Sequence, residues 1–282
     1  MIGVRLVSLA GDPTKPNEDC FVSLPGLTAV FDGVSIPDSL DSGCRHGPAW
    51  YTRMLAASLG AWHAADPHAD LSELLASAIG TVRDEHGGTC DLDHPGTPQS
   101  TLAVLRAGTT SVDYLVLCDS TVVLDQSGDI RAVTDVRLRQ TARSLRRLAL
   151  AGVSPIGSTE QAERIRALTL AKRDHANRPG GYWVAAADPT AAYHAIRGSV
   201  PLAGPEKLTR AALLTDGASC VVDQYALTDW RGLLDMLDSP GPHHVVELAR
   251  ATEQADPEGY ERPRPKPHDD ATIAYCVFSQ EV

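Results

Sequence analysis

The sequence predicts an α+β fold in which antiparallel β-sheets carry helices grouped on their faces. Short β-rich runs follow one another at hairpin spacing, and helical segments come in pairs between groups of such runs. This order fits antiparallel sheets better than a parallel βαβ fold. The chain has 282 residues, of which 43% are hydrophobic and 22% charged, so it can bury a sizeable core. We predict a single domain over residues 1–282.

The N-terminal part is predicted to form strands and then two helices. We expect strands at residues 2–9, 20–24 and 27–31, and helices at residues 47–65 and 70–86. Pro25-Gly26 separates two apolar runs and predicts a hairpin. Pro48 near the start of the first helix and Gly87-Gly88 after the second are typical helix boundaries.

The remaining chain is predicted to alternate between groups of strands and pairs of helices. We expect strands at residues 101–106, 111–117, 121–124 and 130–134, helices at 137–150 and 158–176, strands at 182–186, 192–196 and 211–214, helices at 229–237 and 243–255, and a strand at 271–278. Ser158 and Gln161 form a capping-box pattern at one helix start.

Charge and composition exclude several classes of protein. The net charge of −11 argues against a general nucleic-acid binder, which needs clustered cations. No run of about eighteen apolar residues and no secretory leader pattern occurs, so we expect a cytoplasmic protein that does not bind membranes. The six cysteines show no CxxC pair or zinc-ligand spacing, and we interpret them as reduced, mostly buried thiols rather than disulfides or a zinc site.

Basic residues concentrate in one segment. Residues 135–178 contain ten Lys or Arg and four acids, so the rest of the chain carries a charge of −17. The segment attracts an acidic or phosphorylated partner, or it forms the solvated faces of two amphipathic helices; we favour the second interpretation.

Acidic residues stand at the open end of the predicted hairpin, before its first strand and after its second. If the chain folds back at Pro25-Gly26, Asp19 faces Asp32 and Glu18 faces Gly33. Crowded carboxylates repel one another unless protons or cations neutralise them, and hard divalent cations prefer such oxygen ligands. Glycine at position 33 lets the backbone approach a cation closely.

The same design recurs along the chain. Asp216-Gly217 follows an apolar strand, Asp269-Asp270 precedes another, and Asp119-Ser120 joins two strands. Each of these turns alone is more often a simple solvated turn than a binding site. Their recurrence predicts a metal site built from several strand ends.

Read in order, the motifs NED, FDG, Ser100-Thr101, CDS, TDG and DD-A-T resemble those of the type 2C, metal-dependent Ser/Thr protein phosphatases, the PPM family. The resemblance extends from Glu18 to Phe278, and "VVLDQSGDIRAVTD" is similar to a hairpin of bacterial members. It implies an αββα four-layer sandwich with a two-metal Mn²⁺ or Mg²⁺ site at one edge of the central sheets. It also places a basic insertion at about residues 135–180 in the family's flap region.

The resemblance implies a role for each acidic residue. Asp32 would bridge two metals and the Gly33 carbonyl would bind one, while Asp216 and Asp269 would ligate the other. Glu18 and Asp19 would hold waters around the pair, and Asp119 matches a ligand of a third, weaker site. The implied reaction is direct hydrolysis of a phosphomonoester, in a phosphorylated protein or a small phosphorylated molecule, by a metal-bridging water.

The sequence departs from the family at groups that face the substrate. The family's phosphate-binding Arg is replaced by Thr14, beside Lys15, which supplies charge without a guanidinium fork. Arg45 is a hypothetical replacement for that Arg, and His46 a hypothetical general acid. The alternative, which we favour, is that Arg45 and His46 cap or pack the start of a helix.

Two other functions compete with a phosphatase. A pseudophosphatase would keep the fold as a binding or regulatory module with weak or no turnover, and the lost Arg supports it. An αββα amide hydrolase would need an N-terminal nucleophile, which Met1-Ile2 does not offer. The sequence carries no signal for an oligomeric state.

Overall fold

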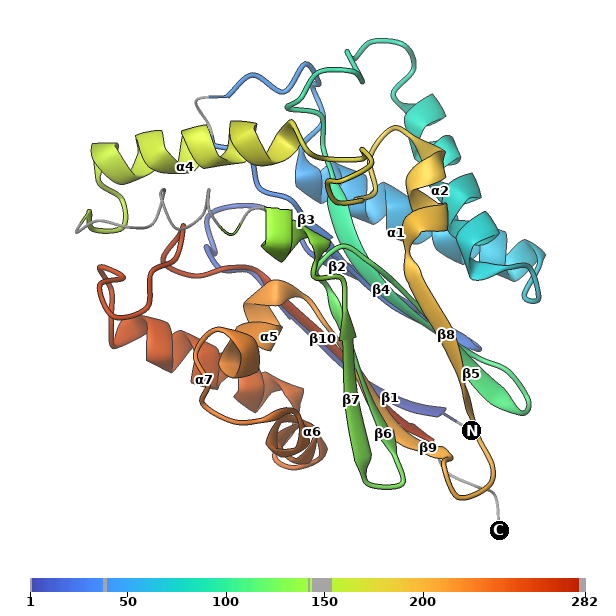
Figure 1. Cartoon of the computed structure of the whole chain (residues 1–282). Helices are drawn as coiled ribbons and strands as arrows, with labels where there is room; N and C mark the ends of the chain where they lie inside the picture. The colour runs from blue at the N-terminus through green and yellow to red at the C-terminus, as the bar shows by residue number, and fades with distance from the viewer. Residues whose placement is uncertain (1, 38–39, 142, 144–153, 279–282) are drawn as a thin grey trace.

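A computed structural model describes residues 2–37, 40–141, 143 and 154–278. Two five-stranded antiparallel sheets face each other, and helices cover the outer face of each (Figure 1). The first sheet has the order β1-β10-β9-β6-β7, formed by Ile2–Leu9, Ala271–Phe278, Leu208–Leu214, Thr121–Gln126 and Asp129–Thr134. The second has the order β2-β3-β4-β5-β8, formed by Cys20–Leu24, Leu27–Gly33, Ser100–Ala107, Ser111–Leu117 and Ile196–Pro201.

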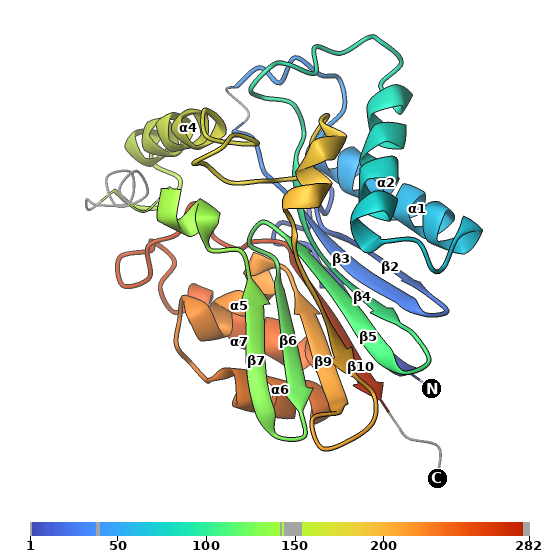
Figure 2. The ribbon, with the colours of Figure 1, turned by 45° about the vertical axis from the view of Figure 1, so that its right-hand side comes forward.

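The helices divide between the two outer faces. The second sheet is covered by α1 (Pro48–Ala65) and α2 (Leu71–Glu85), and the first by α5 (Asp216–Asp223), α6 (Trp230–Asp238) and α7 (Pro242–Gln254) (Figure 2). A further helix, α4 (Thr159–Arg173), lies across one end of the sandwich (Figure 1). The four layers confirm the predicted αββα sandwich.

Three apolar layers hold the sandwich together. Val30, Val116 and Leu213 are fully buried between the two sheets. Leu55 belongs to the cluster under α1 and α2, and Leu234 to the cluster under α5, α6 and α7. Because neighbouring side chains along a strand point to opposite faces, each central strand contributes to two of these layers and reads as a nearly continuous apolar run.

Local signals in the sequence predicted several elements correctly. Gly26 has φ +81° at the tip of the β2–β3 hairpin, a conformation that favours glycine. Ser158 caps α4 by accepting a hydrogen bond from the backbone N–H of Gln161, as its capping-box pattern predicts. In α2 the carboxylate of Asp70 accepts from the N–H of Ser72.

Other predictions were wrong. Residues 182–186 form isolated bridges, Ala176 with Tyr182 and Ser100 with Ala185, instead of a strand. Residues 192–196 mostly belong to the 3₁₀ helix η1 (Pro189–His194), which Asp188 caps and which precedes β8. The helix α5 was not predicted, because the sequence reads there as a turn.

The predicted helix at residues 137–150 is observed at 137–141 and 143, and its remaining residues lie outside the described part of the chain. Among the residues that the structure describes, no helix is both long enough and apolar enough to cross a membrane.

Candidate metal centre

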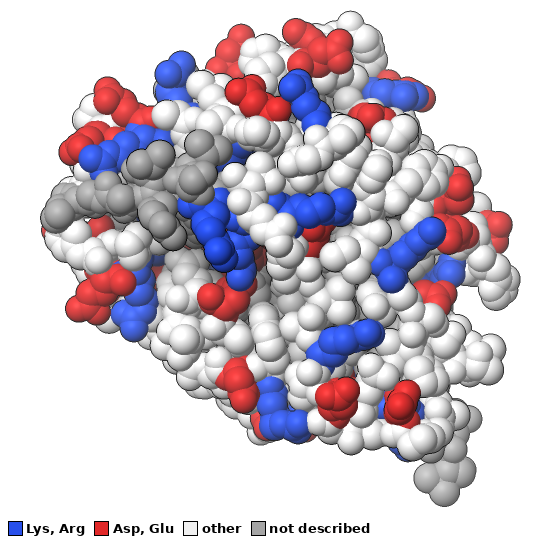
Figure 3. Space-filling model, viewed as in Figure 1, with Lys and Arg blue, Asp and Glu red and all other residues white. Residues whose placement is uncertain are grey.

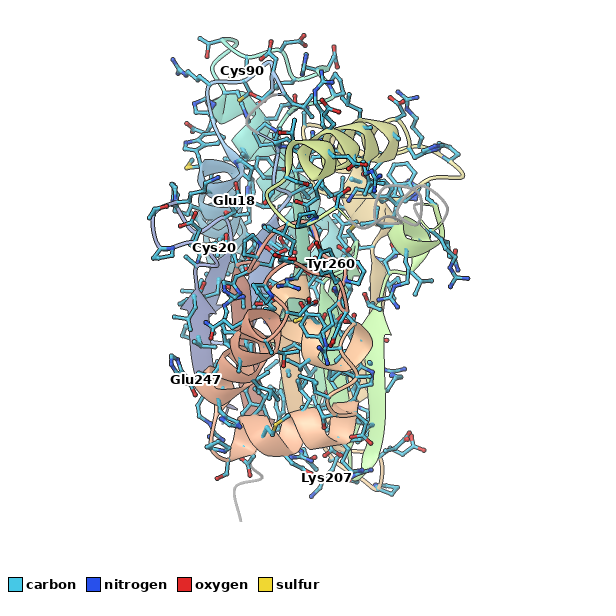
Figure 4. All side chains as sticks on the ribbon, turned by 90° about the vertical axis from the view of Figure 1, so that its left-hand side faces the viewer. Glu18, Cys20, Cys90, Lys207, Glu247 and Tyr260 are labelled. Atoms are coloured by element: carbon cyan, nitrogen blue, oxygen red, sulfur yellow. The ribbon has the colours of Figure 1, made fainter. Side chains whose placement is uncertain are left out.

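The acidic turns identified in the sequence lie at the same end of the sandwich. At this end β3, β5 and β9 stop, while β2, β6 and β10 begin, as their antiparallel registers require. Glu18 marks this end in Figure 4, beside the ends of the strands. Carboxylates far apart in the sequence therefore meet across both sheets.

The β2–β3 hairpin places the first carboxylates as predicted. Cys20 pairs with Phe31, so the next positions, Asp19 and Asp32, face each other beyond the end of the ladder. Asp19 is only 6% exposed. A Cβ atom on Gly33 would lie 2.6 Å from the carbonyl oxygen of Glu18. Gly33 is therefore required for the close approach of the two chain segments.

A second glycine has the same function on the other sheet. Gly217 is the second residue of α5, directly after Asp216, and a Cβ atom there would overlap the carbonyl group of Asp270 and lie 3.1 Å from the Cβ of Asp269. Each Asp-Gly pair thus presses one acidic segment against another, which explains why the motif occurs twice.

Polar groups that are not candidate ligands fix the backbone around the site. The carboxylate of Asp270 accepts hydrogen bonds from the backbone N–H groups of Gly11 and Glu18, each at 2.7 Å. The Thr215 hydroxyl donates to Asp19 at 2.8 Å and accepts from the N–H of Thr272 at 2.9 Å. These bonds tie the segment before β2 to the first residues of β10.

The electrostatics of the cluster favour added positive charge. Burial raises the pKa of Asp32 well above its usual range, and the charges of Asp216 and Asp19 add to this effect. Burial also raises the pKa of Asp19, against the hydrogen bond from Thr215. Burial and the charge of Asp269 raise the pKa of Asp216 to about 7, although the residue is partly exposed to solvent.

Lys266 lies beside the carboxylates, in the Pro-rich stretch between α7 and β10, where the sequence motifs predicted no site residue. Its ammonium group lies 2.5 Å from the carboxylate of Asp269 and donates to the Ser35 hydroxyl at 2.9 Å. Ser35 in turn donates to the carboxylate of Glu18. Burial alone would lower the pKa of Lys266, but the charges of Asp269 and its acidic neighbours raise it above the usual value. Lys266 and Ser35 are 231 positions apart, so no local signal predicted this contact.

The residues present fit hard divalent cations. Within the described part of the chain, the carboxylate of Asp32 has no hydrogen-bond or ion-pair partner, although the charges of several other carboxylates act on it. Carboxylate and carbonyl oxygens are the ligands that Mn²⁺ and Mg²⁺ prefer. Crowded carboxylates repel one another unless protons or cations neutralise them.

Asp119 acts on this cluster through its charge, whereas Lys15 lies in an exposed turn. Asp119 occupies the turn between β5 and β6, and its charge contributes to the raised pKa of Asp32, after burial and the nearer aspartates. Lys15 is exposed in a turn where the backbone N–H and the hydroxyl of Thr14 both donate to the carboxylate of Asp12. Thr14, which occupies the position of the family's Arg, therefore forms its hydrogen bonds within a local turn.

Arg45 contacts His46, and His46 contacts Trp50 of α1. Arg45 is exposed, and its Nε donates to Nε2 of His46 at 3.3 Å. The His46 ring stacks on Trp50, with ring centroids 4.0 Å apart. No contact with the carboxylate cluster is found for either residue within the described ranges, so these partners agree with packing at the start of α1.

The basic segment is only partly a solvated surface. Arg173 is 6% exposed and donates to the carbonyl groups of Pro95 and Thr97, so it fastens α4 to the loop before β4. Arg139 pairs with Asp223 of α5 at 3.2 Å. Other Lys and Arg side chains lie on the surface near α4 (Figure 3). The prediction of a purely solvated helix face is therefore wrong for Arg173.

No protein-family model and no curated protein matches the sequence. Several solved structures match nearly the whole chain. They include the catalytic domain of the serine threonine protein phosphatase PstP in complex with two manganese ions, with a TM-score of 0.59, 17% identity and coverage of 98% of this chain and 97% of that one.

Two further matches are similar in extent. One is the PPM Ser-Thr phosphatase MsPP from Mycobacterium smegmatis in complex with cacodylate, with a TM-score of 0.55, 19% identity and coverage of 98% of both chains. Another is the serine/threonine phosphatase Stp1 from Staphylococcus aureus, with a TM-score of 0.57, 11% identity and coverage of 99% of this chain and 96% of that one. At these identities the likeness shows the fold, which is the one that the sequence motifs predict.

Proposed function

We propose that this chain is a metal-dependent phosphomonoester hydrolase that uses Mn²⁺ or Mg²⁺. The observation that carries the proposal is the meeting of carboxylates from both sheets around Asp32, whose own carboxylate has no hydrogen-bond or ion-pair partner among the described residues. Such a cluster at the ends of strands is suited to hold cations, and the fold is shared with structures named as Ser/Thr phosphatases.

Each side chain has a distinct role in this proposal. Asp32 and the Gly33 carbonyl would hold one cation, with Asp32 shared between two, and Asp216 and Asp269 would hold the second. Glu18 and Asp19 would orient waters around the pair, and Asp119 would contribute to a weaker third site. When bound, the cations supply Lewis acidity and a deprotonated water for direct attack on phosphorus.

Lys266 is our candidate for the positive charge that the substrate phosphate needs. Ser35 and Asp269 hold its ammonium group, so it places a positive charge beside the candidate ligands. A lysine attracts phosphate as a point charge, unlike the bidentate fork of an arginine. The matched structures are named serine/threonine phosphatases, which supports a phosphoprotein substrate, with a small phosphorylated molecule as the alternative.

A binding module with weak or no turnover is the second candidate. Its support is the ion pair between Lys266 and Asp269, which already neutralises one candidate ligand, together with the Thr14 turn in place of an arginine. In this case the fold would bind a phosphorylated partner without hydrolysing it efficiently.

Hydrolysis of para-nitrophenyl phosphate with Mn²⁺ separates the two candidates. We expect turnover that a chelator abolishes and that Asp32→Asn removes, while the exposed control Asp129→Asn leaves it unchanged. Calorimetric Mn²⁺ binding by a wild type that hydrolyses no phosphoester would favour the binding module. A wild type that binds no Mn²⁺ would refute both.

A further inference from the structure

Two loops beside the first helices bring together residues that the sequence holds far apart. Residues 34–47 connect β3 to α1, and residues 86–99 connect α2 to β4. Cys44 and His46 lie in the first loop and Cys90 in the second, and their ligand atoms are all within 4.8 Å of one another. Cys90 lies well above Glu18 in Figure 4, so this cluster is separate from the carboxylate site.

The distances agree with the ligand sphere of a tetrahedral metal ion. Nδ1 of His46 lies 3.5 Å from Sγ of Cys44 and 3.6 Å from Sγ of Cys90. Zinc bonds of about 2.3 Å to sulfur and about 2.05 Å to nitrogen give a tetrahedral N···S edge of about 3.6 Å. A zinc ion therefore needs little movement of these three side chains.

His86 lies beside this set, although no nitrogen of its ring is within 4.8 Å of all three ligand atoms. It is only 2% exposed, and its Nδ1 donates to the carbonyl oxygen of Val82 at 2.8 Å, so in the neutral ring Nε2 is the nitrogen with a free lone pair. This Nε2 is buried and has no hydrogen-bond partner among the described residues. The ring lies edge-on to that of His46, with centroids 5.1 Å apart. A backbone carbonyl that fixes the second ring nitrogen is the usual support of a metal-bound histidine.

We propose that Cys44, His46 and Cys90 bind a structural zinc ion, with His86 as the fourth ligand after a side-chain movement that brings its Nε2 to the ion. Thiolate and imidazole ligands favour zinc, whereas the carboxylate site favours harder ions, so the two sites select different metals. When zinc binds Nδ1 of His46, the proton of the imidazole lies on Nε2. Nε2 then no longer accepts the hydrogen bond from Arg45, so this exposed side chain turns away.

The ion would fasten the loop that starts at the carboxylate site. The backbone N–H of Asp91 already donates to the carbonyl of Gly43 at 2.8 Å, next to the proposed ligands. At the other end of the same loop, the N–H of Val34 donates to the carbonyl of Gln99 at 3.0 Å, directly after Gly33. Zinc would therefore fix the course of both loops relative to α1 and α2.

Cobalt substitution tests the proposal with a signal specific to sulfur ligands. Chelator-treated, fully reduced protein is titrated with Co²⁺, and thiolate ligation produces charge-transfer absorption that a carboxylate site does not give. We expect this absorption to saturate at one ion per chain and to disappear when Zn²⁺ is added, because zinc binds such sites more tightly. We expect Cys44→Ser and Cys90→Ser to lose it, while the matched control Cys20→Ser, a half-buried cysteine outside the cluster, keeps it.

The role of His86 has its own readout. We expect His86→Ala to keep the thiolate absorption but to weaken Zn²⁺ binding about 10- to 100-fold. The absence of thiolate absorption in reduced wild type would overturn the proposal, and so would a Cys44–Cys90 disulfide that persists under reducing conditions. Both measurements use the wild type and do not depend on the folding of a variant.

Discussion

Replacing Gly33 by alanine tests whether the carboxylate site depends on close contact between two chain segments. The added Cβ would lie 2.6 Å from the carbonyl oxygen of Glu18 and 3.1 Å from the Cβ of Pro48. Ordinary contact begins at 3.4 Å, so the backbone of Glu18 must move by about 0.8 Å. Pro48, the first residue of α1, blocks compensation from the other side. The strain therefore falls on the segment that carries Glu18 and Asp19.

The size of this shift sets the expected effect. A misplacement of about 1 Å can cost about 100-fold in rate, so we expect Mn²⁺-dependent turnover of Gly33→Ala to fall roughly 10- to 100-fold. The free energy of unfolding should fall by about 1–3 kcal/mol, as for other overpacked positions. Calorimetry with Mn²⁺, phosphatase kinetics and urea denaturation measure the three effects.

A matched glycine provides the control. A Cβ atom on Gly3 of β1 meets no atom within 4 Å, so Gly3→Ala should leave metal binding and turnover unchanged. If Gly33→Ala bound Mn²⁺ as tightly as the wild type and turned over as fast, the close approach would not be a requirement of the site.

Three further substitutions or conditions test the surrounding electrostatics. The pKa of Asp216 is raised to about 7, so the metal-free folded chain keeps a proton that the unfolded chain loses near pH 4. The free energy of unfolding should therefore fall as pH rises from about 4 to about 7. Saturating Mn²⁺ should remove this fall in thermal denaturation, and stability that increases with pH without metal would contradict the assignment. Lys266→Met removes the cation paired with Asp269 and should tighten Mn²⁺ binding up to about fivefold while lowering turnover. Weaker Mn²⁺ binding in calorimetry would argue against competition between Lys266 and the metal for Asp269. Asp270→Ala leaves two backbone N–H groups without their acceptor and should lower the free energy of unfolding by about 2–4 kcal/mol in urea denaturation. The loss should be smaller for Asp270→Asn, and equal losses would count against the role of Asp270 as the acceptor of these two hydrogen bonds.

The hairpin shows what the sequence predicts well. Pro25-Gly26 and the alternating runs beside it fix the register over a few residues, so the facing positions of Asp19 and Asp32 follow from local information alone. The order of the acidic turns resembles the motif series of the type 2C phosphatases, and that resemblance, rather than the turns themselves, implied the αββα sandwich that the structure shows.

Contacts between distant segments were not predictable in this way. Lys266 lies in a Pro-rich stretch whose composition indicates a linker, and only the folded chain places it against Ser35. Cys44 and Cys90 lack the short spacing of zinc motifs and come together through the packing of α1 against α2. Residues 182–186 have the apolar composition of a strand, yet Tyr182 and Val184 pack beside Cys118 in a small separate cluster.

The origin of the candidate ligands in both sheets has a consequence for the lifetime of the chain. Asp32 belongs to β3 of one sheet, whereas Asp216 and Asp269 flank β9 and β10 of the other. Ions bound between them would act as reversible cross-links across the sandwich, adding about 2.7 kcal/mol of stability when their concentration is 100 times the dissociation constant. When manganese and magnesium are scarce, the chain would then unfold more often and be degraded faster by proteases.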